Sequence, residues 1–177
     1  MSKNTPARYQ PMQVTMHWLT VILVFAAFIA GKSMSQLPND TAKLMPLAIH
    51  MSIGILTLVV LVIRFVARTR LPKPAHAATG SAFLDWLGKA VHYALYVLVF
   101  SMAITGISLS MQAGLAPIVF GGSGTLLPVD FYDFTARMLH GFIAPALLIL
   151  VLLHVGAALY HQFVLKDNLL SRMWYIK

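Results

Sequence analysis

The sequence contains no cysteine among its 177 residues. That absence excludes disulfides, thiolate metal ligands, iron–sulfur clusters and the covalent attachment of a c-type haem. Charge is scarce as well. Only 10% of the residues are charged and five are acidic, whereas a soluble domain carries about a quarter charged residues. Because 59% of the residues are apolar, the composition is that of an integral membrane protein.

Four apolar runs are each long enough to cross a bilayer as a helix, which takes about 20 residues. The chain has no internal repeat and no room for a separate soluble domain. We therefore expect residues 1–177 to form a single integral-membrane domain, an all-α bundle of four transmembrane helices. The connection between the third and fourth runs is unusually apolar, and we expect it to pack on the end of the bundle rather than to act as a lid. The expected helices cover about residues 14–31, 47–67, 90–111 and 138–163.

The distribution of Lys and Arg predicts the orientation, because cytoplasmic loops carry an excess of these residues. Of the 13 cations, only Lys32, Lys43 and Arg137 flank the two connections that lie on the opposite side from the termini. Both termini are therefore expected in the cytoplasm. The net charge of +8 follows membrane topology, so we expect no nucleic-acid partner. The cations assigned to the cytoplasmic side are Lys3, Arg8, Arg64, Arg68, Arg70, Lys73, Lys89, Lys166, Arg172 and Lys177.

Histidines recur in these apolar runs at matched depths. In the fourth run His140 and His154 are 14 residues apart, which at about 100° per residue puts them on one face of a helix. With the orientation above, His154 lies at the depth of His17 in the cytoplasmic half, and His140 lies at the depth of His50 near the outer ends. The four histidines thus form two pairs, roughly 20 Å apart along the helix axis.

Two imidazoles on different helices suit the iron of a haem with two axial histidines, which carries electrons and has no open position for oxygen. Two such sites would make a transmembrane electron path. The alternative is a cofactor-free protein whose histidines form hydrogen bonds between helices. We favour haem, because the apolar runs hold no acidic partner for a proton relay and the ligands do not converge at one depth. Gly54, Gly141 and Gly156 would leave room for a flat macrocycle, or serve close helix packing.

Several motifs are specific in order and spacing. They are "MHWL" in the first run, "AIHMSIG" in the second, "HG" and "LLHVGAALYHQF" in the fourth, and "LKDNLLSRM" near the C-terminus. In these motifs the chain resembles the bacterial cytochrome b561 family along nearly its whole length. The resemblance implies a protein of the bacterial inner membrane in which four helices hold two b-type haems. The implied axial ligands are His17 with His154 and His50 with His140.

The resemblance further implies a superoxide:ubiquinone oxidoreductase, which oxidises superoxide at the periplasmic face and passes the electrons to ubiquinone. A cytochrome b subunit that takes electrons from a periplasmic hydrogenase or dehydrogenase partner is the alternative. The short outer loops, which offer little docking surface, favour superoxide. Arg137, three residues before His140, is the candidate catalytic residue that would attract the anion. A contact with a haem propionate and an interfacial anchor are equal alternatives for this side chain.

At the inner end, His161 lies two turns beyond His154. We expect it to bind a quinone carbonyl and to relay a proton, a reading that the resemblance strengthens; the alternative is a histidine that reaches the lipid headgroups. Trp18, beside His17, is expected to pack on the inner haem or the quinone, or to belong to the interfacial aromatic belt. His92, at a similar depth in the third run, is interpreted as a hydrogen-bonding side chain or a propionate contact.

Overall fold

A computed structural model describes residues 8–75 and 79–175 of the chain. Lys3 and Lys177, which entered the orientation argument, lie outside the described residues. Within the described part every regular element is helical and there is no strand. The four long helices are α1 (Pro11–Met34), α2 (Leu44–Arg70), α3 (Ala82–Gln112) and α5 (Thr135–Tyr160).

Each of these four helices is long and apolar enough to cross a membrane, which confirms the expected all-α protein with four membrane-spanning helices. Each also extends beyond the apolar run from which it was predicted. At the start of α1, the Gln13 side chain accepts a hydrogen bond from the Gln10 N–H at 3.1 Å, so the helix begins before the apolar run does. At the other end of the chain, the π-helical turn η3 (His161–Leu165) continues α5.

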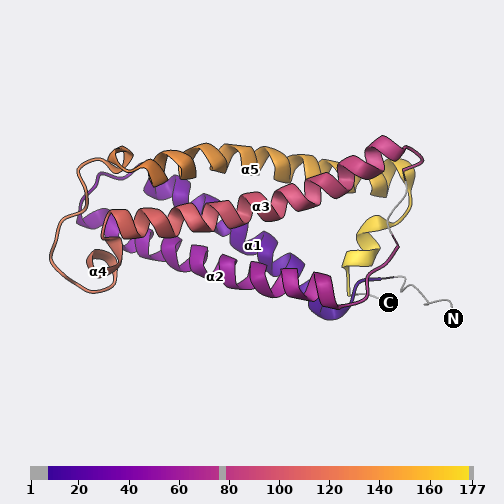
Figure 1. Cartoon of the computed structure of the whole chain (residues 1–177), viewed down its shortest axis with the longest axis horizontal. Coiled ribbons are helices and arrows are strands. Elements are labelled where there is room, and N and C mark those ends of the chain that lie inside the picture. The colour runs from indigo at the N-terminus through magenta and orange to yellow at the C-terminus, as the bar shows by residue number, and fades with distance from the viewer. Residues whose placement is uncertain (1–7, 76–78, 176–177) are drawn as a thin grey trace.

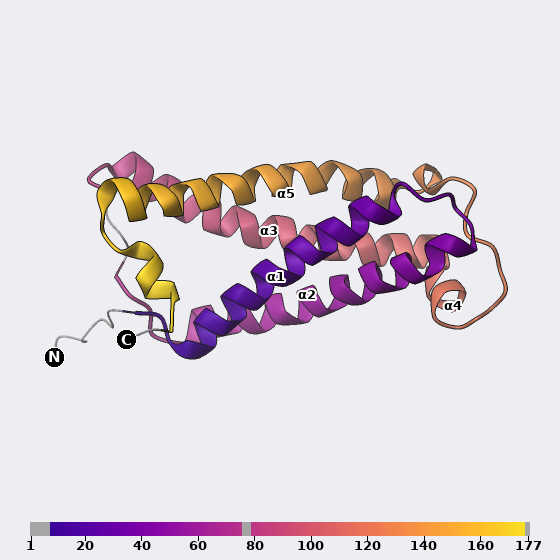
Figure 2. The same ribbon diagram turned by 180° about the vertical axis from the view of Figure 1, so that it is seen from behind.

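The long helices run antiparallel in an elongated bundle (Figure 1). α1 packs mainly against α2 and α3 mainly against α5, and the view from behind shows α1 crossing in front of α2 (Figure 2). The beginning and the end of the described chain lie together, since the Tyr9 N–H donates to the Arg172 carbonyl at 3.2 Å. The short helix α4 (Leu115–Val119) lies at the opposite end (Figure 1). We call the end with α4 the outer end and the other the inner end.

The centre of the bundle is a buried apolar cluster to which each long helix contributes one side chain: Val24, Leu61, Val99 and Leu147. Leu147 is seven residues from both His140 and His154, so the cluster lies between the two histidine layers. Many apolar side chains on the outside of the bundle are exposed instead. This arrangement suits a protein whose surface faces lipid, where apolar side chains need no burial.

The connection between α3 and α5 packs on the outer end of the bundle, as expected. Leu115 and Leu127 from this connection form a buried cluster with Leu47 of α2. Gly114 makes the turn from α3 into α4 with a φ of 59°, a conformation that side chains other than glycine disfavour. Packing therefore explains the apolar residues Leu115 and Leu127, whereas Phe120, Leu126 and Val129 of the same connection are exposed.

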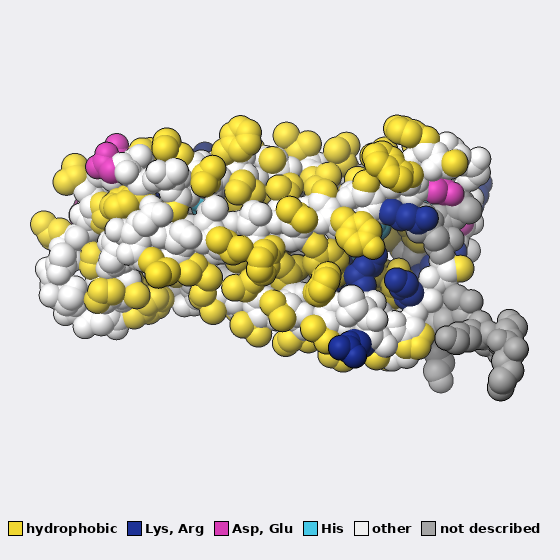
Figure 3. Space-filling model, in the orientation of Figure 1, with side chains coloured by type: hydrophobic (Ala, Val, Ile, Leu, Met, Phe, Trp, Pro, Cys, Tyr) yellow, Lys and Arg dark blue, Asp and Glu magenta, His cyan; other side chains and the backbone are white. Residues whose placement is uncertain are grey.

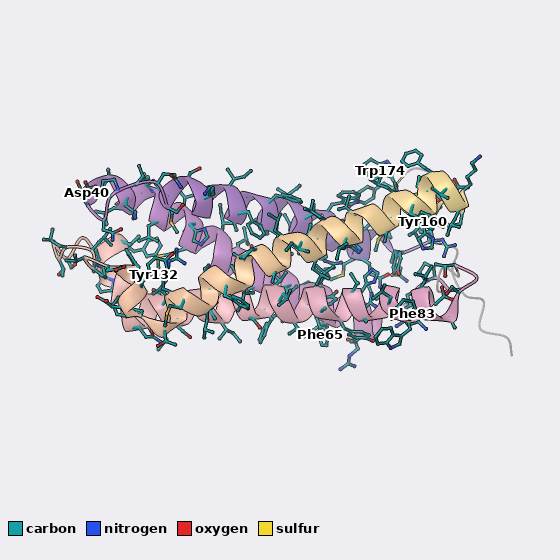
Figure 4. The ribbon with its side chains drawn as sticks, turned by 90° about the horizontal axis from the view of Figure 1, so that it is seen from above. Asp40, Phe65, Phe83, Tyr132, Tyr160 and Trp174 are labelled. Carbon is teal, nitrogen blue, oxygen red and sulfur yellow. The ribbon has the colours of Figure 1, made fainter. Side chains whose placement is uncertain are left out.

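Charged side chains gather toward the inner end. On the face drawn in Figure 3, Lys and Arg side chains cluster near the end where the described chain begins and ends. Figure 4 separates the two ends by labelled residues: Asp40 and Tyr132 lie at the outer end, Tyr160 and Trp174 at the inner end. The side of the membrane that each end faces stays a prediction from the cation distribution.

Candidate functional site

The structure brings together the histidines that the sequence analysis paired. At the outer end the ring centroids of His50 and His140 are 6.1 Å apart, with an interplanar angle of 82°. At the inner end those of His17 and His154 are 6.4 Å apart, at 66°. In residues 8–75 and 79–175 no group of three or more His, Cys, Asp or Glu side chains could hold a metal ion. The paired histidines at each end come from two different helices, and the ring of His92 also lies near His154 at the inner end.

The spacing of each pair fits a metal ion bound between the two rings. A metal lies about 2 Å from the imidazole nitrogen that binds it, and the centre of the ring lies about 1 Å beyond that nitrogen. Two axial rings on one metal therefore have centroids roughly 6 Å apart. Both observed separations match this value. All four side chains are half-buried in the bundle. The spacing of both pairs thus fits an iron whose other four ligands come from a macrocycle.

Both rings of the outer pair are oriented by hydrogen bonds to Nδ1. The Nδ1–H of His50 donates to the Ala27 carbonyl at 3.1 Å. The Thr105 hydroxyl donates its hydrogen to the carbonyls of the preceding turn of α3. Its oxygen therefore accepts a hydrogen bond from the Nδ1–H of His140 at 3.0 Å. With the proton on Nδ1, Nε2 is left as a free lone-pair donor, and such partners fix the ring of a metal-bound histidine.

The outer rings also lie against glycines of neighbouring helices. A Cβ atom added to Gly31 of α1 would lie 3.1 Å from Cε1 of His50, and one added to Gly106 of α3 would lie 3.4 Å from Cε1 of His140. Sequence reasoning missed both glycines as well as Thr105. A signal existed for Thr105 and Gly106, because the third run places them near the depth of His140, but nothing in the sequence gives the rotation of α3.

The three glycines that were expected to leave room divide into two cases. A Cβ atom on Gly54 or Gly156 would meet no atom within 4 Å. At Gly141 the expectation of room for a macrocycle is wrong for this structure: Nη1 of Arg137 lies 2.6 Å from the position that its Cβ would take. Gly141 instead makes room for the guanidinium of the residue one turn before it.

The inner pair has a different environment, which is cationic. Nη2 of Arg64 donates to Nδ1 of His17 at 2.8 Å, and the same guanidinium lies 5.3 Å from the centre of the Tyr96 ring. His92, whose Nδ1–H donates to the carbonyl one turn back in α3, has its ring centroid 4.9 Å from that of His154. The sequence analysis used Arg64 only for orientation. In the structure it provides positive charge beside the inner pair, where an anionic group would be stabilised.

Arg137 and Trp18 lie at opposite ends. The guanidinium of Arg137 lies 4.7 Å from the centre of the Tyr132 ring, at the outer end (Figure 4). At the inner end, Nε1 of Trp18 donates to the Met173 carbonyl at 2.9 Å, and its ring packs edge-on against those of Trp174 and His17. Trp18 therefore holds the C-terminal segment against α1 next to the inner pair.

His161 begins the η3 turn and is paired with a carboxylate. Its Nδ1 lies 2.6 Å from Oδ2 of Asp167, and Oδ1 of the same carboxylate accepts from the Leu169 N–H at 3.1 Å. The chain reverses there through two non-glycine residues with positive φ, Lys166 at 54° and Asn168 at 57°. Left-handed backbone costs an ordinary residue about 1–2 kcal/mol, so the rest of the turn has to stabilise this conformation.

Comparison with known proteins gives consistent results over almost the entire chain. The profile of the family described as prokaryotic cytochrome b561 matches residues 8–175. Cytochrome b561 homolog 2 of Escherichia coli K12 is 34% identical, over 96% of this chain and 93% of that protein. The probable superoxide oxidase CybB of Yersinia pestis is 31% identical, over 94% of this chain and 95% of its own length. Cytochrome b561 homolog 1 of Escherichia coli K12 is 25% identical over a similar span.

Proposed function

The chain belongs to the prokaryotic cytochrome b561 family, and from this premise we propose that it is a superoxide:ubiquinone oxidoreductase with two b-type haems. Family membership makes it a multi-pass bacterial membrane protein that transfers electrons through b-type haem. The finer proposal rests on one observation above all: two histidine pairs, 6.1 and 6.4 Å between ring centroids, lie at opposite ends of one bundle. Under this proposal His50 and His140 bind the outer haem, and His17 and His154 bind the inner one.

Each bound haem would supply an iron that takes up and releases one electron at a time. Two axial imidazoles leave no position at which oxygen could coordinate, so these four residues restrict the site to electron transfer. The apolar cluster around Leu61 and Leu147 packs between the two layers. Superoxide loses one electron and becomes dioxygen. Two such oxidations supply the two electrons that ubiquinone combines with two protons to form ubiquinol.

The two substrates would use opposite ends. We assign superoxide to the outer end, where Arg137 supplies a positive charge one turn before His140, and we assign this end to the periplasm. The name of the relative from Yersinia pestis supports superoxide as the donor. We assign ubiquinone to the inner, cytoplasmic end beside His161 and Trp18. The cation distribution supports this orientation in the inner membrane, with both termini in the cytoplasm.

A superoxide pulse given to the oxidised, detergent-purified protein tests the proposal. The haem α-band is followed and scaled to the spectrum of the fully dithionite-reduced protein, and ubiquinone is then added. Fast reduction of a large fraction, followed by re-oxidation on addition of quinone, is the expected result. A normal dithionite spectrum that superoxide barely changes would reject superoxide and favour a protein donor such as a periplasmic dehydrogenase. A colourless protein would reject haem altogether.

Replacing Arg137 with glutamine is expected to slow haem reduction by superoxide about three- to tenfold, because one attracting charge near the outer site is lost. The slowing should diminish as salt is added, since salt screens the attraction in the wild type. Stopped-flow rates at several ionic strengths measure this, and R137K, which keeps the charge, is the matched control. If R137Q has the wild-type rate but an altered outer-haem spectrum, Arg137 is a structural contact and not part of the superoxide site.

Replacing Thr105 with valine is expected to raise the reduction potential of the outer haem and to weaken its retention about ten- to a hundredfold. Valine cannot accept the Nδ1–H bond of His140, so the imidazole becomes a weaker electron donor to iron and loses its orientation. A spectroelectrochemical titration reports the potential of each haem separately. T105S keeps the hydroxyl and should behave like the wild type, whereas equal potentials in T105V and T105S would contradict the assignment of this bond.

A further inference from the structure

The turn after α5 holds an imidazole and a carboxylate in a fixed relation. The side chains of His161 and Asp167 are only 13% and 24% exposed, although both belong to a segment at the end of the bundle. Nδ1 of His161 lies 2.6 Å from Oδ2 of Asp167. A carboxylate can only accept, so the ring carries its proton on Nδ1, and Nε2 points its lone pair elsewhere.

We propose that Asp167 is the positioning residue of the quinone site: it holds His161 in the tautomer whose Nε2 delivers protons to ubiquinone. This inference rests on the proposed function, since it assumes that quinone is reduced at the inner end. His161 takes a proton from cytoplasmic water at Nε2 while the carboxylate balances the charge on the ring, the role that an aspartate has beside a catalytic histidine. The N–H bond at Nε2 then breaks as an O–H bond forms on the quinone. Each ubiquinol needs two such transfers and the electrons of two superoxide ions.

The backbone of the turn is arranged around this pair. The Asp167 N–H donates to the His161 carbonyl at 3.3 Å, which brings the carboxylate back onto the ring, and the Leu169 N–H fixes its other oxygen at 3.1 Å. The π-helical turn is a rare conformation, and the positive φ of Lys166 is unfavourable for a side chain of this kind. Asn168 is of a residue type that tolerates positive φ. If the helix only had to end here, a glycine after its last turn would suffice. The ordinary residues found here are consistent with a turn that serves to place Asp167.

A second observation is an unpartnered polar atom in the same turn. Oε1 of Gln162, the residue after His161, is buried and has no hydrogen-bond partner in the structure. A buried carbonyl oxygen without a donor is unfavourable, so such an atom needs a specific explanation. A quinol hydroxyl is a donor of the required kind, next to the histidine that would protonate the quinone oxygen.

The test isolates the quinone half of the reaction. Haem-loaded protein is reduced with stoichiometric dithionite, mixed with a short-chain ubiquinone, and followed at the α-band in H₂O and in D₂O. For D167N we expect re-oxidation to slow by about tenfold or more, with a larger solvent isotope effect and a nearly unchanged half-saturating quinone concentration. D167E should recover part of the rate, and acetate should recover part of the rate of D167A. D133N, which removes a carboxylate at the outer end, is the matched control and should keep the wild-type rate.

Each result has a separate meaning. Wild-type rate and isotope effect in D167N would overturn the inference while leaving quinone reduction intact. Slow re-oxidation with an unchanged isotope effect, no rescue by acetate and an equally slow D167E would also overturn it, because the residue would then be merely structural. If the wild-type haem itself is not re-oxidised by quinone, the proposed function fails and the inference fails with it. The haem spectrum and the rate of reduction by superoxide should stay unchanged in D167N.

Discussion

Purified H140A protein is expected to contain one haem in place of two, with the remaining absorbance belonging to the inner site. Under the proposed assignment His140 supplies one of the two axial ligands of the outer haem, and alanine offers no donor atom. His50 alone cannot hold a six-coordinate iron, because the described part of the chain has no group of three or more His, Cys, Asp or Glu side chains that could hold a metal ion. Haem extraction and the low-temperature α-band measure the loss. Reduction by superoxide should fall by more than about tenfold, because the entry point for electrons is gone.

The corresponding variant at the inner site, H154A, is the matched comparison for H140A. It should lose the inner haem, keep the outer one, and still be reduced by superoxide, but it should no longer pass electrons to quinone. Together the two variants separate the ends of the path. If H140A keeps both haems, the ligand assignment is wrong. If each variant loses both haems but stays folded by size-exclusion chromatography and helical circular dichroism, the two sites are not independent.

Replacing Gly31 is expected to lower the haem content nearly as much as replacing an axial ligand, although Gly31 has no side chain. Its Cα lies against the ring of His50, and a Cβ would come within 3.1 Å of Cε1. The same ring donates to the carbonyl of Ala27, one turn before Gly31 in α1, at 3.1 Å, so a movement of the ring away from α1 would lengthen that bond. We expect G31A to lose a large part of the outer haem and G31V to lose nearly all of it, as measured by haem content per chain.

Two other glycines supply graded controls. G106A, where the added Cβ would be 3.4 Å from Cε1 of His140, should cause a smaller loss than G31A. G88A should keep both haems, because an added Cβ there meets no atom within 4 Å; its helix should be slightly more stable, by up to about 1 kcal/mol. Full haem content in G31V would show that the ring of His50 has more freedom than this contact implies.

The depth of each histidine followed from the sequence, because depth depends only on helical rise and on which loops carry Lys and Arg. Those two rules placed His17 beside His154 and His50 beside His140 at equal depths, and the structure brings the members of each pair together. The rotation of each helix about its axis is set by packing against neighbours that the sequence does not identify. For that reason Thr105 and Gly31 were missed and Gly141 was given the wrong role.

The environment of the inner pair was missed for another reason. Orientation was the preferred interpretation of Arg64, and only the fold reveals its bond to His17. The pairing of His161 with Asp167 depends on a π-helical turn and on positive φ at two ordinary residues. Secondary-structure propensities predict neither feature for the sequence "HQFVLKDN". His161 was expected at the quinone end, but its contact with Asp167 was not predicted.

The pairing of the long helices has a consequence for biogenesis. Because α1 associates with α2 and α3 with α5, the protein consists of two hairpin-like halves. The first half contributes His17 and His50, and the second contributes His140 and His154. Under the proposed ligand assignment neither half contains a complete haem site, so haem binding and the joining of the halves would form one coupled equilibrium, as metal binding and folding do in small metalloproteins. In lipid the hydrophobic effect does not drive helices together. Haem bound between the two halves would therefore stabilise their association.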